Sequence, residues 1–114
     1  MILIKRKPGM SFDDFVDYYE NVHSKLASRV PNLRRYARNF IRPYGNDVYA
    51  GAAELPFDVV TEICFDDEAE FHKGMAYLTE PETAAIVAAD EENLFDRSSI
   101  IFVTADERVS NLGG

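Results

Sequence analysis

Apolar side chains recur every three or four positions between residues 11 and 30, which is the spacing of one face of an α-helix. These positions are Phe12, Phe15, Val16, Tyr19, Val22, Leu26 and Val30. Ser11 can cap the start of this helix by accepting a backbone N–H, and Asp14, three residues later, can complete a capping box. Pro31 and Asn32 break the pattern. We therefore predict one continuous helix over residues 11–30.

Short segments with alternating or continuous apolar residues predict β-strands. These segments are residues 1–5, 33–41, 57–65 and 99–104. The last one contains four large apolar residues in succession at 100–103, which is typical of a strand that is buried on both faces.

Two further helices are predicted between the third and fourth strands. The first follows the aspartate pair at 66–67, which can cap it, and runs to about residue 78. The second starts within Thr79-Glu80-Pro81-Glu82, where threonine can cap the helix and proline suits its first turn. Its alanine-rich body spans residues 83–90, and Leu94 and Phe95 close it.

The two consecutive helices between the third and fourth strands count as one helical segment. The predicted order is then strand, helix, strand, strand, helix, strand. This order is typical of a ferredoxin-like βαββαβ fold of the α+β class, in which a four-stranded antiparallel sheet carries its helices on one face. A chain of 114 residues has the length of one domain, so we expect residues 1–114 to form a single unit.

Side chains alternate between the two faces of a strand, so the sequence also predicts the faces of the sheet. The more apolar set should face the helices and consists of Tyr36, Phe40, Thr61, Ile63 and Phe65. The opposite set is mixed and consists of Arg35, Ala37, Asn39, Ile41, Val60, Glu62 and Cys64. A partly apolar sheet face needs cover, so we expect a homodimer that forms through this open face.

The charge balance narrows the classes of partner and cofactor. A net charge of −8 argues against binding to nucleic acid and to anionic membranes. With one cysteine and two distant histidines, the chain has no expected metal site, and no glycine-rich phosphate loop or Gly-x-Ser-x-Gly motif is present. We expect no cofactor. The chain opens without the apolar run of a signal peptide, so a cytoplasmic location is expected.

Two residues are candidates for acid/base chemistry, His23 on the helical stripe and Tyr36 on the next strand. An imidazole exchanges protons near neutral pH, and a phenol can donate a hydrogen bond to an oxygen that develops negative charge. Both residues equally suit a structural role in the core. The expected pocket around them is mostly apolar, as ligand sites usually are. Its predicted substrate-binding residues are Tyr19, Phe40, Ile63 and Phe71, with Tyr44 and Tyr49 in a covering loop.

Several motifs together resemble the EthD-like family of the dimeric α+β-barrel superfamily. The motifs are Arg6-Lys7-Pro8-Gly9, Phe12, Phe15, Tyr19, Glu20-Asn21-Val22-His23, Pro31, Leu33-Arg34-Arg35-Tyr36, Glu62, Phe65-Asp66-Asp67, Asp90-Glu91-Glu92 and Phe95-Asp96. The resemblance covers nearly the whole chain, and Val22-His23 with Leu33 to Tyr36 is its most specific part. It implies that two sheets meet as a barrel in a homodimer.

The resemblance also implies a chemistry. His23 and Tyr36 match the histidine and tyrosine of a cofactor-free isomerase of the same superfamily, but that enzyme's cysteine, directly after a strand glutamate, is not matched. Here Ile63 follows Glu62, and Cys64 comes one position later. We expect a cofactor-independent acid/base enzyme, an isomerase, cyclase or dehydratase-type lyase, that acts on a small apolar cyclic, aromatic or polyketide-like substrate. The alternatives are a non-catalytic small-molecule-binding accessory protein and a cofactor-free monooxygenase.

Overall fold

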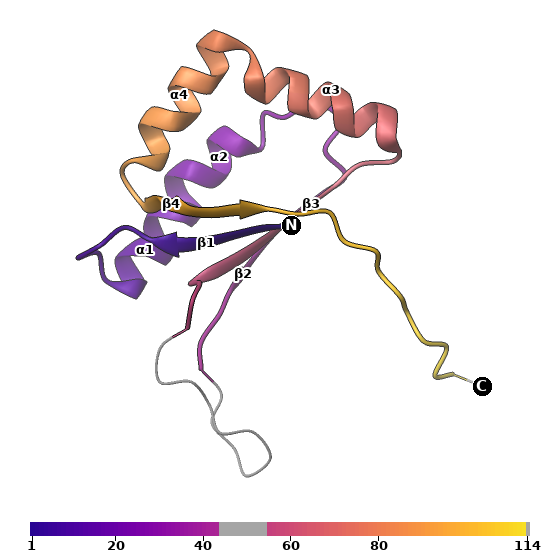
Figure 1. Cartoon of the computed structure of the whole chain (residues 1–114), viewed down its shortest axis with the longest axis horizontal. Coiled ribbons are helices and arrows are strands. Elements are labelled where there is room, and N and C mark those ends of the chain that lie inside the picture. Colours follow the sequence, from indigo (N-terminus) through magenta and orange to yellow (C-terminus); the bar gives the residue numbers. More distant parts are fainter. Residues whose placement is uncertain (44–54, 114) are drawn as a thin grey trace.

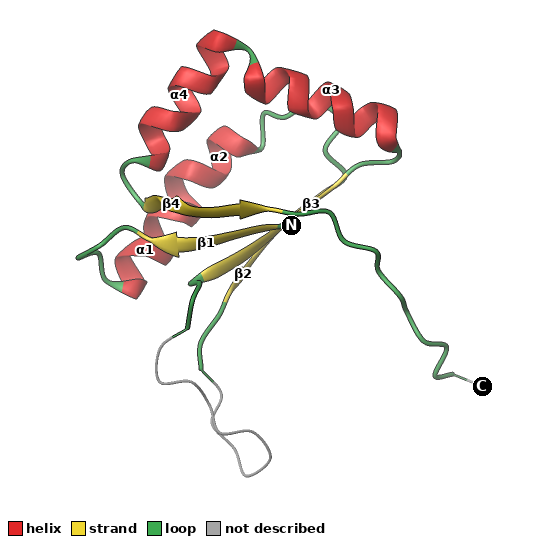
Figure 2. Ribbon diagram, viewed as in Figure 1, coloured by secondary structure: helices red, strands yellow, loops and turns green. Residues whose placement is uncertain are grey.

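The computed structural model describes residues 1–43 and 55–113. The strands are β1 (Ile2–Arg6), β2 (Arg35–Phe40), β3 (Val59–Cys64) and β4 (Phe95–Phe102). The helical segments are α1 (Phe12–Tyr18), η1 (Tyr19–His23), α2 (Ser24–Ala27), α3 (Glu68–Thr79) and α4 (Pro81–Glu91). The helices gather along one side of the strands (Figure 1 and Figure 2). The α+β class and the ferredoxin-like order of elements are therefore confirmed.

The four strands form one antiparallel sheet in the order β2-β3-β1-β4. Tyr36 lies opposite Ile63, and Ala37 lies opposite Glu62. Val59 and Thr61 on β3 are buried. The residues that alternate with them, Val60 and Glu62, are only partly buried. This pattern agrees with the predicted division of the sheet into a helix-covered face and an open face.

The first predicted helix is interrupted. Ser11 caps α1 as expected, because its Oγ accepts a hydrogen bond from the backbone N–H of Asp14 at 3.1 Å. A π-helical turn, η1, then replaces the regular α-helix, and α2 ends at Ala27 rather than near residue 30. Within this turn His23 is buried, whereas Val22 is 44% exposed.

The main core lies between the sheet and the segment α1–η1. Its buried members are Ile4, Phe15, Tyr19, Val59, Leu94 and Phe95. The Phe15 ring meets the rings of Tyr19, Phe40 and Phe95 edge to face, each with centroids 6.0 Å or less apart in the favoured T-shaped arrangement. This aromatic packing fixes the position of η1 over the sheet.

The last strand differs from its prediction. It begins at Phe95, which was expected to close the preceding helix, and its far end is exposed, with Ile101 at 48% and Phe102 at 45%. This strand lies at the sheet edge, where it pairs with β1 alone, and Ile101 is on the face of the sheet that carries no helices. Residues 103–113 are all exposed, and after Val103, which is hydrogen-bonded to Met1, the chain leads away from the sheet (Figure 1). Within residues 1–43 and 55–113, no helix has the length and apolar character needed to cross a membrane.

Candidate functional site

His23 and Asp90 form the centre of a hydrogen-bonded group that joins three helical segments. His23 ends η1 and is 5% exposed, and its Nδ1 lies 2.8 Å from Oδ2 of Asp90 on α4. The other Asp90 oxygen, Oδ1, accepts a hydrogen bond from the Tyr18 hydroxyl at 2.5 Å. Asn93 donates to that same hydroxyl at 3.0 Å. We call Tyr18, His23, Asp90 and Asn93 the Asp90 network.

The Asp90 network favours an ionised carboxylate. Burial by itself would raise the pKa of Asp90, but the hydrogen bonds from Tyr18 and His23 outweigh it and hold the pKa below its usual range. The same contact with Asp90, together with burial, raises the pKa of the Tyr18 phenol. An ionised Asp90 accepts hydrogen bonds only, so Nδ1 of His23 carries a proton. In the neutral imidazole, Nε2 is then the atom that can accept a proton.

Two aromatic rings contact the imidazole. Its centroid lies 5.3 Å from the Tyr19 ring and 5.0 Å from the Phe95 ring, both in edge-to-face contacts. Within the described parts of the chain, Asp90 is the only hydrogen-bond partner of the His23 side chain.

Two tyrosines next to this group differ in how their hydroxyls are satisfied. The Tyr19 hydroxyl is buried and hydrogen-bonded to Thr61 Oγ1 at 2.7 Å. The Tyr36 hydroxyl is also buried; no described residue meets it with full hydrogen-bond geometry, but the Tyr19 phenol lies close enough for each of the two phenols to shift the pKa of the other. Burial, with the nearby Tyr19 phenol, raises the pKa of Tyr36, so this hydroxyl stays protonated. A buried donor without an acceptor costs roughly 1–3 kcal/mol.

Arg38 holds Tyr36 against the π-helical turn. Its guanidinium donates to both carboxylate oxygens of Glu20, at 2.9 and 2.7 Å, and its carbon Cζ lies 4.6 Å from the centroid of the Tyr36 ring. The hydrogen bonds from Arg38 lower the pKa of Glu20 despite its partial burial. This bidentate pair ties β2 to η1, the segment that carries both Tyr19 and His23.

The predicted site residues fall into two groups. Tyr19 and His23 are core residues, and Tyr36 and Phe40 pack against the core, with Phe40 5.6 Å from the Tyr19 ring. Ile63 and Phe71 instead line a cavity of about 770 Å³. The predicted covering tyrosines, Tyr44 and Tyr49, lie outside the described residues. The roles assigned to all of these residues stay predictions.

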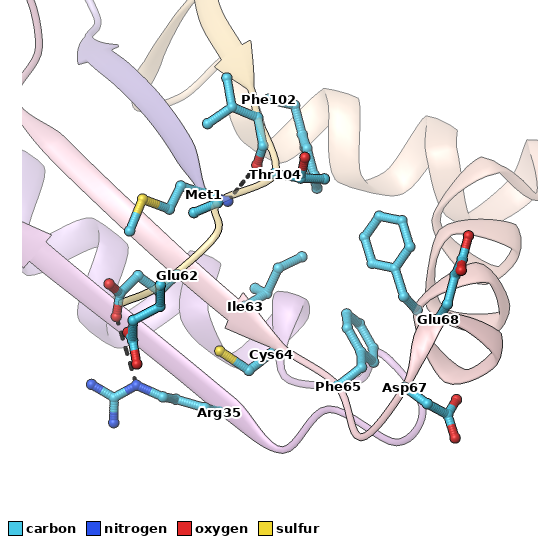
Figure 3. A pocket seen from close by; sticks show the side chains of 14 residues that line it. Met1, Arg35, Glu62, Ile63, Cys64, Phe65, Asp67, Glu68, Phe102 and Thr104 are labelled. Carbon is cyan, nitrogen blue, oxygen red and sulfur yellow. Dashed lines mark hydrogen bonds and ion pairs between the residues drawn. The ribbon is translucent and has the colours of Figure 1, made fainter. Parts of the chain in front are cut away.

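The cavity lies where β3 ends and α3 begins (Figure 3). Phe65 and Phe71 meet edge to face at 5.7 Å and provide apolar lining. The exposed side chain of Cys64 and the Arg35–Glu62 ion pair, at 3.6 Å, belong to the same lining. Glu62 therefore has an ion-pair partner within its own chain.

Sequence reasoning missed Tyr18, Asp90 and Asn93 as members of the site. Asp90 was noticed only as part of an acidic motif, and no local pattern connects it with His23. The signal that could have found it is geometric, because a buried imidazole needs a hydrogen-bond partner and α4 is the helix that crosses η1. Among the described residues, no three His, Cys, Asp or Glu side chains form a group that could hold a metal ion.

Comparison with known proteins identifies the family. The family model of the EthD domain matches residues 7–98, which contain all of the helices, the Asp90 network and Tyr36. No curated protein matches the chain. The match covers far more than half of the sequence, and the sequence motifs resemble the same family, so the chain belongs to the EthD domain family.

Proposed function

We propose that this protein is a cofactor-independent acid/base enzyme, an isomerase, cyclase or dehydratase-type lyase that acts on a small apolar cyclic, aromatic or polyketide-like substrate. The observation that carries the proposal is the 2.8 Å contact between His23 Nδ1 and Asp90 Oδ2 in a buried setting. A carboxylate that fixes the tautomer of an imidazole is the arrangement that a histidine base needs.

In this proposal His23 is the base and Asp90 is its positioning residue. Nε2 takes a proton from the carbon next to a substrate carbonyl and returns it elsewhere, or delivers it to a departing hydroxyl. The imidazolium that forms between these steps is stabilised by the ionised Asp90. General acid/base help of this kind contributes roughly 10²–10⁴ in rate.

Tyr36 is the proposed hydrogen-bond donor to the substrate oxygen. Removing the α-proton moves negative charge onto the carbonyl oxygen, and a buried, protonated phenol without an acceptor suits that position. Arg38 supports the role because its guanidinium stacks on the phenol ring and restricts it. A donor of this kind is worth roughly 10²–10³ in rate.

The cavity at the end of β3 is the proposed place for the apolar body of the substrate, although its lining includes neither His23 nor Tyr36. Ile63 lines it and is the register partner of Tyr36 on the neighbouring strand. A volume of about 770 Å³ lies within the usual range for small-molecule sites. Phe71 contributes an aromatic wall, and Tyr19, Phe40, Tyr44 and Tyr49 remain predicted substrate-binding residues.

Solvent deuterium exchange tests the proposal before any product is known. Aromatic lactones and polyketide-like diketones are incubated with the protein in D₂O, and exchange of the protons next to the carbonyl is followed by NMR. We expect at least one compound to exchange faster with wild-type protein, His23→Gln to abolish the gain, and Asp90→Asn and Tyr36→Phe to reduce it. His72→Gln is the control and should keep wild-type exchange, because His72 is exposed and lines neither the cavity at the end of β3 nor the Asp90 network. Equal exchange by wild type and His23→Gln contradicts the proposal.

One observation favours the alternative of a non-catalytic small-molecule-binding accessory protein. His23 is almost fully buried and already bonded to a protein carboxylate, as expected of a structural or anchoring histidine. In that case a ligand that raises the melting temperature would bind more weakly to His23→Gln and Tyr36→Phe, and no compound would exchange deuterium or turn over. Oxygen uptake with the same compounds tests the cofactor-free monooxygenase.

We also propose that the protein forms a homodimer through the open sheet face and works in the cytoplasm. Ile101 pairs with Leu3, whose neighbour Ile4 points into the core, so both Leu3 and Ile101 lie on the face without helices. The 48% exposure of Ile101 leaves apolar surface that a second sheet would bury. The cytoplasmic location rests on the sequence alone.

A further inference from the structure

A groove separates α4 from the segment η1–α2 on the helical side of the molecule. No residue of α4 is buried, and the Asp90 network attaches this helix to η1 near its C-terminal end. The groove has a volume of about 430 Å³. Its lining residues are Val22, Lys25, Leu26, Arg29, Ile86, Ala89, Asp90 and Asn93.

The middle of the groove is apolar. Val22 and Ile86 are large aliphatic residues that are 44% and 50% exposed, and Leu26 and Ala89 lie beside them in the lining. A ligand that covers these aliphatic side chains gains roughly 25 cal/mol of binding free energy for each Å² of apolar surface that it removes from water. The helix side of the fold therefore offers a binding surface that is separate from the open sheet face.

The groove carries more positive than negative side chains, whereas the chain as a whole is negatively charged. The protein carries a net charge of −8, yet the groove has two exposed cations, Lys25 and Arg29, that have no ion pair with any described residue. The anion of the groove, Asp90, is already bonded to Tyr18 and His23. Figure 1 shows that α2 and α4 run in opposite directions. Arg29 follows α2 and Asp90 is near the C-terminal end of α4, so the order of the chain places them towards opposite ends of the groove.

We propose that this groove binds a small apolar molecule that carries a carboxylate. Its apolar body covers Val22 and Ile86, and its carboxylate pairs with Lys25 and Arg29, away from Asp90. The volume of about 430 Å³ matches a ligand of this size. The site goes beyond the proposed enzyme function, because it uses neither Tyr36 nor the cavity at the end of β3, and its test needs no turnover.

Titration calorimetry on the full chain with decanoate, decanol and decylammonium tests the proposal. All three are kept below the concentrations at which they form micelles or separate from solution. We expect decanoate to bind at least tenfold more tightly than the other two, and its affinity to fall as salt is added. A parallel titration with 1-naphthoate distinguishes an aliphatic from an aromatic body, and tight binding of either carboxylate supports the proposal.

Two double variants locate the site. Lys25→Glu with Arg29→Glu should weaken decanoate binding at least tenfold, whereas Lys73→Glu with Arg108→Glu, the same charge change outside the groove, should leave affinity within twofold after allowance for net charge. In methyl NMR spectra, decanoate should shift the Val22, Leu26 and Ile86 signals. Equal affinity for decanoate and decylammonium overturns the proposal. So does a shift confined to Ile63 in the other cavity, or an unchanged affinity in the first double variant.

Discussion

Nδ1 of His23 lies 2.8 Å from Oδ2 of Asp90, although 67 positions separate the two residues in the chain. The contact joins the π-helical turn that follows α1 to the last helix before β4. It fixes the tautomer of the imidazole and at the same time attaches α4 to the rest of the fold.

The stability of the protein should depend on the ionisation of Asp90. Its pKa in the folded chain is lowered, so Asp90 stabilises the fold above its unfolded pKa of about 3.9, and this contribution is lost as the pH falls through the folded value. We expect urea unfolding between pH 7 and pH 2.5 to show a steeper loss of unfolding free energy for wild type than for Asp90→Asn. Parallel curves for the two proteins would contradict the lowered pKa.

Removing one hydroxyl from each of two neighbouring tyrosines should have opposite effects on stability. Tyr36→Phe deletes a buried hydroxyl that has no described partner, so the unfolding free energy should stay unchanged or rise by up to about 1 kcal/mol. Tyr19→Phe leaves the buried Thr61 hydroxyl without its partner and should lower stability by about 1–2 kcal/mol. Chemical denaturation of both variants measures this. A loss of stability in Tyr36→Phe equal to that in Tyr19→Phe would mean that the Tyr36 hydroxyl has a partner after all.

The order of the elements and the two faces of the sheet could be predicted from sequence because both depend on local patterns. The alternation around Thr61 and Ile63 is one example, and the Ser11 cap is another. The π-helical turn could not be predicted, because the stripe of residues 12–30 fits a regular helix equally well. Phe95 was assigned to the end of the helix, whereas it begins β4. A pair of apolar residues after a helix fits the last turn of that helix and the start of the next strand equally well.

The Asp90 network could not be predicted from local patterns, because it forms only when α4 packs against α1 and η1. His23 could be recognised as a candidate from its position on the apolar stripe, whereas its partner depends on where α4 crosses η1. The same holds for Arg38, which the sequence presents as one of several basic residues near the second strand. Only the packed structure shows that Arg38 pairs with Glu20 and covers Tyr36.

The Arg38–Glu20 pair should couple more strongly than an exposed pair of the same type. A double-mutant cycle that replaces Arg38 and Glu20 by alanine should give a coupling free energy of roughly 1–2 kcal/mol, because the pair is bidentate and Arg38 is 21% exposed. The control cycle uses Arg34 and Asp66, which are 67% and 55% exposed and should couple by less than about 0.5 kcal/mol. Similar coupling in both cycles would mean that the contact with Glu20 adds no special restraint to Tyr36.

Two isoleucines with nearly equal exposure provide a test of the proposed dimer. Ile101 is 48% exposed on the open sheet face, and Ile86 is 50% exposed on α4. A lysine at the centre of an apolar interface must lose its hydration shell, so Ile101→Lys should shift the protein towards monomer. Ile86→Lys should leave the dimer intact, because α4 lies on the helical side of the sheet. Sedimentation equilibrium at micromolar concentrations measures both. A wild-type protein that sediments as a monomer rules out the dimer, and a dimer that survives Ile101→Lys but not Ile86→Lys places the interface on the helices instead.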